Sequence, residues 1–169
     1  MKILLVTEAL SPESAGLDPG GLSVAQRVAA LALRLEEAGH EVRLVTGQWT
    51  DAETLHAKRV WESPLSLSGD MRVTVLEGRL GEIPVYVLEG HEPPSIVLGG
   101  GVPELVLALD WRPDVIHAHD AGGGLVPLVI RERFGEHPAF RELGLLFTVH
   151  DLSRQGVEGP EILDKVGLD

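Results

Sequence analysis

The chain has 169 residues, and its 26 acidic side chains outnumber 14 basic ones to give a formal net charge of −12. Phosphate backbones and anionic membranes repel such a surface, which argues against a nucleic-acid or membrane partner. The chain contains no cysteine, so disulfides and thiolate metal sites are excluded. No apolar run reaches the roughly 20 residues of a membrane span, and no signal-peptide core follows Met1. We therefore expect one soluble, cytoplasmic domain with a core of its own.

The N-terminal part of the chain has the pattern of a βαβ unit. Lys2–Thr7 is a short apolar run without alternation, which is typical of a strand buried on both faces of a parallel sheet. A loop rich in proline, glycine and serine follows at Ser11–Gly21. Apolar residues then recur at helical spacing over Leu22–Leu35, and Glu41–Thr46 is predicted to be the second strand. Such a unit is a right-handed crossover between parallel strands.

The helix of this unit carries signals at both ends. Ser23 and Gln26 have the spacing of a capping box, in which each side chain bonds the backbone N–H of the other residue. Gly39 is placed to end the helix, because glycine readily adopts the left-handed conformation found just after helices. These residues predict where the helix begins and ends.

The middle of the chain is less regular. Asp51–Trp61 is consistent with either a helix or a loop. Met71–Leu76 and Ile83–Leu88 are rich in β-forming residues and flank a turn at Gly78–Gly81, which predicts a hairpin. Pro84 has no backbone N–H to donate, so the hairpin is predicted to lie at an edge of the sheet.

A regular α/β pattern returns in the last third of the chain. Pro103 and Pro127 are each expected in the first turn of a helix, where a missing N–H is tolerated. The whole pattern predicts an α/β fold: a Rossmann-like parallel sheet with helices on both faces and an inserted β-hairpin. The elements expected here are a helix at Val102–Leu109, a strand at Asp114–His119, a helix at Leu125–Arg133, a strand at Leu145–Val149 and a short helix at Glu161–Val166.

Three of the predicted strands end in residues suited to binding a ligand. Asp18–Gly21 follow the first strand, and His150-Asp151 follow the last. His117–Asp120 close the strand between them and lead to Gly122–Gly124. In open α/β sheets, ligands bind at the carboxyl ends of the parallel strands. If these strands are parallel, the three clusters lie on one rim and form one site.

Two of these clusters allow both a functional and a structural interpretation. Gly20-Gly21 opens a helix and could dock a phosphate on backbone N–H groups, but a tight turn explains the pair slightly better. His117 and His119 share one side of a strand, whereas Asp120 is expected on the other, which argues against a metal site. His117 is expected to be a core histidine that is hydrogen-bonded to a neighbour.

The third cluster is equally open. His150-Asp151 could supply a general base near neutral pH, or be a loop histidine followed by a capping aspartate. Ser153 lies close by in the sequence, but the G-x-S-x-G context of a hydrolase nucleophile is absent. A hydrolase triad of serine, histidine and aspartate is therefore rejected.

Three segments resemble the glycogen and starch synthases, a family of GT-B glycosyltransferases. Met1–Gly47 is similar to the opening of GT-B enzymes, with a Gly-Gly-Leu loop and then Ala38-Gly39-His40-Glu41-Val42. Trp111–Asp120 is close to the W-R-P-D-V-V-H-A-H-D of the family. Phe147–Leu152, with Gln155-Gly156 beyond it, resembles the F-T-V-H-N-L…Y-Q-G of the family.

The resemblance implies a retaining transferase that moves glucose from ADP-glucose or UDP-glucose to the end of an α-1,4-glucan. Its partners would be this donor and this acceptor, and it would require neither a metal nor a cofactor. Residues 1–169 would form a single Rossmann-like domain on the acceptor side, the N-terminal half of a GT-B fold. By position, Asp120 and His150 match catalytic residues of the family, with His150 against the donor glucose. Gly20 and Gly21 match the loop that binds the donor nucleotide.

The chain departs from the family pattern at the donor site. Asp18 stands where the family has a lysine that contacts the nucleotide, and a carboxylate there repels a diphosphate. Ala121 and Gly123 stand where the family has a tryptophan and a histidine. We expect a truncated N-terminal domain without the C-terminal nucleotide-sugar domain, and hence a chain that is inactive alone. The alternatives are a non-catalytic module that binds a sugar or nucleotide and, with less support, a metal-dependent hydrolase built on His117, His119 and Asp120.

Overall fold

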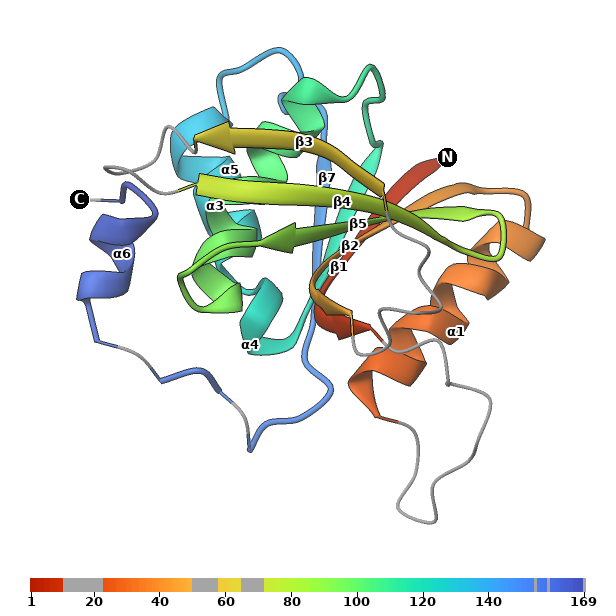
Figure 1. Ribbon diagram of the computed structural model, residues 1–169, viewed down its shortest axis with the longest axis horizontal. Coiled ribbons are helices and arrows are strands. Elements are labelled where there is room, and N and C mark those ends of the chain that lie inside the picture. The colour runs from red at the N-terminus through yellow and green to blue at the C-terminus, as the bar shows by residue number, and fades with distance from the viewer. Residues whose placement is uncertain (11–22, 50–57, 65–71, 154, 158, 169) are drawn as a thin grey trace.

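The computed structural model describes residues 1–10, 23–49, 58–64, 72–153, 155–157 and 159–168, with only the backbone for 58–64 (Figure 1). The loop expected at Ser11–Gly21 lies outside the described residues. The candidate donor residues Gly20 and Gly21 and the substituted Asp18 lie outside them as well. The site is therefore built here from the strand ends that the structure describes.

The described residues form one sheet of seven strands with helices around it (Figure 1). The strands are β1 (Lys2–Leu10), β2 (Glu41–Trp49), β3 (Lys58–Pro64), β4 (Arg72–Leu80), β5 (Ile83–Glu89), β6 (Val115–His119) and β7 (Gly144–Thr148). The helices are α1 (Val24–Glu37), α3 (Pro94–Ala108), α4 (Asp120–Gly123), α5 (Leu125–Phe134) and α6 (Glu161–Lys165). The order of strands across the sheet is β3-β4-β5-β2-β1-β6-β7.

The four strands expected at the centre of the sheet are present and parallel, but β7 lies at one edge of the described sheet and not in its centre. β1 pairs in parallel with β2 on one side and with β6 on the other, and β6 pairs in parallel with β7. This confirms the predicted Rossmann-like α/β fold and brings the carboxyl ends of β1, β2, β6 and β7 to one rim. β1 and β2 extend beyond the predicted Thr7 and Thr46, to Leu10 and Trp49.

The predicted hairpin is confirmed, but its place in the sheet was only partly predicted. β4 and β5 pair antiparallel around a turn in which Gly81 has φ +60°. The strand at this edge of the described sheet is β3, in a segment where the sequence indicated a helix or loop, and β5 lies between β4 and β2. Pro84 is tolerated inside the sheet because the parallel ladder between β2 and β5 begins only at Val85.

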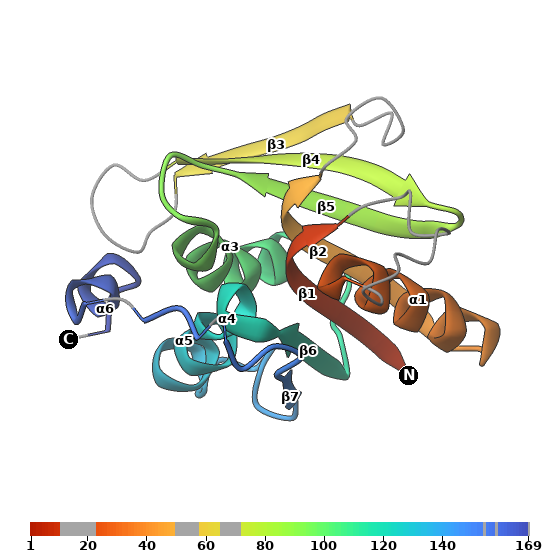
Figure 2. The same cartoon turned by 90° about the horizontal axis from the view of Figure 1, so that it is seen from below.

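The layers on the two faces of the sheet come from different helices. α1 covers one face, where Val28, Ala29 and Ala32 pack in a core cluster with Ile3 and Leu5 of β1. α3 and α5 cover the other face, and Figure 2 shows them on the opposite side of β1 from α1. The predicted helices on both faces are confirmed.

The caps predicted for α1 are also confirmed. The Gln26 backbone N–H donates to Ser23 Oγ at 3.2 Å, and the Ser23 backbone N–H donates to Gln26 Oε1 at 2.7 Å. Gly39 follows the helix with φ +85°. The capping box fixes the first turn of α1 beside the carboxyl ends of β1 and β2.

The third helix begins earlier than the sequence predicted. α3 runs from Pro94 to Ala108, so Pro103 lies inside it instead of in its first turn. The glycines before Pro103 belong to the helix and allow close packing: an added Cβ on Gly101 would lie 2.4 Å from Leu88 Cδ2 of β5. Burial of α3 against β5 and α5 outweighs the weak helix propensity of glycine and proline.

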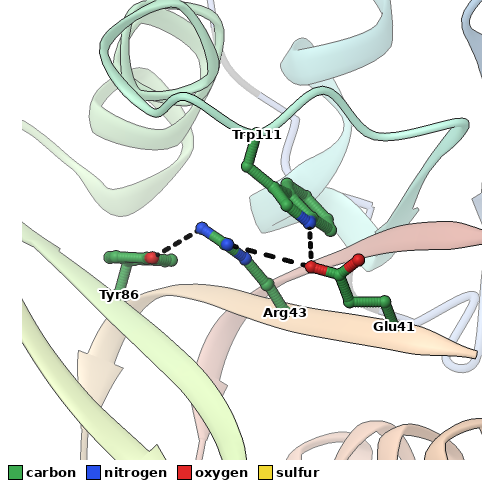
Figure 3. Close-up of polar contacts among 4 residues, drawn as sticks. All are labelled: Glu41, Arg43, Tyr86 and Trp111. Carbon is green, nitrogen blue, oxygen red and sulfur yellow. Dashed lines mark hydrogen bonds and ion pairs between the residues drawn. The ribbon is translucent and has the colours of Figure 1, made fainter.

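The tryptophan that opens the Trp111–Asp120 segment stabilises the fold at the amino end of the sheet (Figure 3). Trp111 is buried, and its Nε1 donates a hydrogen bond to the Glu41 carboxylate. The Arg43 guanidinium lies 4.4 Å from the Trp111 ring centroid, donates to the Tyr86 hydroxyl at 3.0 Å and pairs with Glu41 at 3.9 Å. Burial raises the pKa of Tyr86. This network ties the segment before β6 to β2 and β5.

Candidate functional site at the carboxyl rim

Buried polar side chains lie at the carboxyl ends of the central strands. Among the described residues, three polar side chains are buried: Thr7 of β1, Thr46 of β2 and His119 of β6. Thr7 and Thr46 are directly paired in the parallel register, and His119 directly follows Ala118, which pairs with Val6 of β1. A polar row therefore crosses the sheet at the rim where ligands bind in open α/β folds.

Asp120 joins the end of β6 to the end of β7. It has φ 52°, a left-handed conformation that few residues other than glycine adopt. Its Oδ1 accepts hydrogen bonds from the backbone N–H of His150 at 2.6 Å and from that of Asp151 at 3.2 Å. A strained backbone held by charge-assisted hydrogen bonds is a recurrent feature of functional sites. The structure thus brings the two predicted catalytic residues together, while their roles stay a prediction.

The expected orientation of Asp120 was wrong. Strand alternation placed its side chain away from that of His119, but both residues contact His150: Asp120 through the His150 backbone and His119 through the His150 ring. The reason is that β6 ends at His119, so alternation stops there, and the positive φ of Asp120 turns its carboxylate toward β7.

Three histidine rings line up beside this junction. The ring centroids of His117 and His119 lie 4.0 Å apart, which confirms that the two side chains share one side of β6, and those of His119 and His150 lie 5.2 Å apart. His119 Nδ1 and His150 Nε2 are 3.0 Å apart, and His117 Nε2 lies 2.7 Å from Thr148 Oγ1. The rings form a continuous hydrogen-bonded and stacked group from β6 to β7.

The buried histidine is His119, and not His117 as the sequence suggested. His119 is 1% exposed, whereas His117 is half-buried and has the expected hydrogen-bonded neighbour, Thr148. Burial lowers the pKa of His119 most, the neighbouring His117 and His150 also lower it, and Asp120 opposes them, so that the pKa is about 3. Burial also lowers the pKa of His117. Both rings are neutral at physiological pH.

A cavity of about 310 Å³ lies over this rim, between the start of α1 and the ends of β1, β2 and β6. Its described lining contains the carboxylates of Glu8, Asp120 and Asp151 and no lysine or arginine. A wider groove of about 940 Å³ shares Glu8 and Ala121 with this cavity and continues past the start of α3 toward Gln155. Asp120 lines the smaller of these two hollows.

The described residues do not support the metal-site hypothesis. Within the described ranges, no group of three or more histidine, aspartate or glutamate side chains could hold a metal ion. One nitrogen of His117 and one of His119 are already engaged, with Thr148 and His150 respectively. The described residues therefore give no support to a metal-dependent hydrolase at this rim. In the same described part, no helix is long and apolar enough to cross a membrane.

Sequence reasoning missed the links that hold this site together. It did not connect Thr148 with His117, or His119 with His150, because these residues are 31 positions apart in the chain. These links follow from the register of the sheet, in which β6 and β7 pair residue by residue from Val115 with Gly144 to His119 with Thr148.

The fold and the site at the carboxyl rim are compared first with solved structures, which give the class of protein. The structure superposes on the catalytic domain of starch synthase IV from Arabidopsis thaliana, solved with ADP and acarbose, with a TM-score of 0.77 and 18% identity. The match covers 99% of this chain and 37% of that one. The chain therefore has the fold of the front part of a GT-B glycosyltransferase. The family model of the starch synthase catalytic domain matches residues 2–169, and the chain belongs to that family.

Curated relatives agree with this assignment. The glycogen synthase of Geotalea uraniireducens is 33% identical over 192 aligned residues, which cover 100% of this chain and 39% of the relative. Glycogen synthase 2 of Geobacter metallireducens is 31% identical with the same coverage. The chain thus spans about two fifths of the length of the curated relatives it matches.

The buried, neutral His119 predicts a specific pH dependence of stability. The unfolded chain takes up a proton at this residue below the ordinary histidine pKa of about 6.5, whereas the folded chain does not until about pH 3. His119 therefore does not reduce the free energy of unfolding above about pH 6.5, and it reduces it progressively as the pH is lowered. Between pH 8 and pH 5, we expect a loss of about 2 kcal/mol from this residue.

Urea unfolding of the wild type and of His119→Asn at the two pH values measures this loss. The variant should lose about 2 kcal/mol less than the wild type between pH 8 and pH 5. His91→Asn, which changes an exposed histidine, is the matched control and should keep the wild-type slope. Equal slopes for the wild type and His119→Asn would show that His119 is accessible to protons in the folded chain.

Proposed function

We propose that this chain forms the acceptor-side part of a retaining glucosyltransferase that moves glucose from ADP-glucose or UDP-glucose to the end of an α-1,4-glucan. Family membership and the glycogen synthases among the relatives support the reaction class. The single observation that carries the proposal is the junction of Asp120 and His150 beside a cavity at the carboxyl rim. That is where a substrate of an open α/β enzyme binds.

The proposed roles follow from the charge that develops in such a transfer. The sugar gains oxocarbenium character as the nucleotide departs, and fixed dipoles and carboxylates near the anomeric carbon stabilise it. We assign His150, through its ring and backbone carbonyl, to the donor glucose. Asp120 holds the His150 backbone at 2.6 Å and adds negative charge beside it. Gly20 and Gly21, by their place before α1, are proposed to bind the donor nucleotide.

The reaction proposed here uses no metal and no cofactor besides the nucleotide-sugar donor. The cations that stabilise a departing diphosphate must come from other residues, because the described lining of the cavity is acidic. We propose that a second, nucleotide-binding domain of the kind that completes a GT-B enzyme supplies them. The greater length of the relatives supports this division of the site.

Ligand titration of the ¹⁵N-labelled chain tests the proposal. Maltoheptaose and, separately, ADP-glucose are added while backbone amide shifts are followed by NMR. We expect maltoheptaose to shift the amides of His150 and Asp151, whose N–H groups bond Asp120, and to leave the Trp111 network at the other end of the sheet unchanged. If neither ligand perturbs the rim at millimolar concentration, the proposed site is wrong.

A non-catalytic sugar-binding module is the second candidate. The observation that favours it is the acidic lining of the cavity, which suits sugar hydroxyls better than a diphosphate. The two candidates differ when a nucleotide-binding domain is supplied. A catalytic part gains transfer activity on mixing with the complementary C-terminal segment of the Geotalea uraniireducens glycogen synthase, whereas a binding module does not.

A further inference from the structure

The hydrogen bond between His119 and His150 leaves one ring nitrogen of His119 to be explained. His119 Nδ1 lies 3.0 Å from His150 Nε2. His119 Nε2 is buried, and no described residue hydrogen-bonds to it. Because the ring is neutral, it carries one N–H and one lone pair, and the two nitrogens must divide them.

The free-energy cost of an unpaired polar group determines which nitrogen of His119 carries the proton. A buried N–H without an acceptor is rarer and costlier in folded proteins than an acceptor with an unused lone pair. If the proton sat on Nε2, that N–H would have no acceptor among the described residues. With the proton on Nδ1, the N–H donates to His150, and Nε2 keeps only a lone pair. The second arrangement is favoured.

We propose that His119 is a positioning residue that holds His150 in a single tautomer. The Nδ1–H of His119 donates to His150 Nε2, so the neutral His150 ring carries its own proton on Nδ1. Asp120 fixes the His150 backbone from the same end of β6 through the 2.6 Å hydrogen bond. Two successive residues of β6 and α4 thereby set both the backbone and the ring of His150.

The consequence for the reaction rests on the proposed function. With Nε2 occupied by His119, the ring nitrogen that His150 can offer to a sugar is an Nδ1–H donor, which suits a hydroxyl oxygen. His150 then binds and orients the sugar, and it does not act as a general base through that nitrogen. The His117 ring lies tilted against that of His119, with the centroids 4.0 Å apart, and it is itself engaged by Thr148.

Long-range ¹H–¹⁵N NMR correlations of the labelled chain at pH 8 identify the protonated nitrogen of each neutral histidine. His150→Gln assigns the signals. We expect the proton of His150 on Nδ1 and that of His119 on Nδ1 as well. A wild-type spectrum with His150 protonated on Nε2 overturns the proposal, and this measurement needs no substrate.

Three variants separate positioning from general packing. The side-chain amide of asparagine reaches the place of His Nδ1, and that of glutamine the place of Nε2, so His119→Asn should keep the Nδ1–H tautomer of His150. His119→Gln and His119→Phe should lose the hydrogen bond to His150, and the protonated nitrogen of His150 should change to Nε2. If His150 stays Nδ1–H in His119→Phe with a folded amide spectrum, something else sets its tautomer. Failure of glucan to bind would contradict the proposed function and leave this result unaffected.

Discussion

The 169-residue chain, purified and assayed alone, is expected to extend maltooligosaccharides with neither ADP-glucose nor UDP-glucose. Transfer with retention builds negative charge on the departing diphosphate, and preorganised positive groups supply the largest stabilising term. The loss of one such group typically lowers kcat by about 10²–10³. The described cavity lining has no lysine or arginine, and the sequence of residues 11–22 contains Glu13 and Asp18 but no basic residue.

The assay compares this chain with the glycogen synthase of Geotalea uraniireducens under identical conditions. Glucan products are separated by length after incubation with each donor and a maltooligosaccharide acceptor. The relative should lengthen the acceptor, and the chain should match the control without enzyme. Extension by the chain that disappears in Asp120→Ala would mean that it builds a complete site by itself.

Asp120→Ala is expected to destabilise the fold by about 2–4 kcal/mol, because two backbone N–H groups lose a charged acceptor. Alanine also tolerates the φ of 52° poorly, since its Cβ clashes in the left-handed region. Asp120→Asn keeps an oxygen acceptor and a residue type that visits this region, so it should lose about 1 kcal/mol or less.

Urea unfolding at pH 7 measures both variants, with the exposed Asp110→Ala as the control for loss of a surface carboxylate. The control should change stability by less than about 0.5 kcal/mol. If Asp120→Ala is as stable as the wild type, the junction between β6 and β7 does not depend on this carboxylate. The proposed role of Asp120 in holding His150 would then have to be withdrawn.

The segment Trp111–Asp120 combines two tasks at opposite ends of one strand. Trp111 and Asp114 act at the amino end, where Trp111 bonds Glu41 and Asp114 accepts the backbone N–H of Lys2 at 2.7 Å. His119 and Asp120 act at the carboxyl end, where they hold His150. A short motif therefore anchors β6 in the sheet and supplies two residues of the candidate site.

The sequence by itself determined the parallel strands, the caps of α1 and the rim on which the site lies. These features depend on local signals: continuous apolar runs, the Ser23–Gln26 spacing and the residues that follow each strand. Apolar periodicity reports burial directly, and a capping box is satisfied within one turn of chain.

The tertiary structure alone decided the start of α3, the place of Pro84 inside the sheet, the burial of His119 and the turn of Asp120 toward β7. Each of these depends on which neighbour covers a residue. Gly101 fits in a helix because β5 packs against it, and Pro84 is tolerated because β2 pairs only from Val85 onward. His119 is buried and linked to His150 because β7 aligns beside β6, a pairing between segments about 30 residues apart. Contacts at that separation leave no periodic signal along the chain, so only the folded arrangement of the strands shows them.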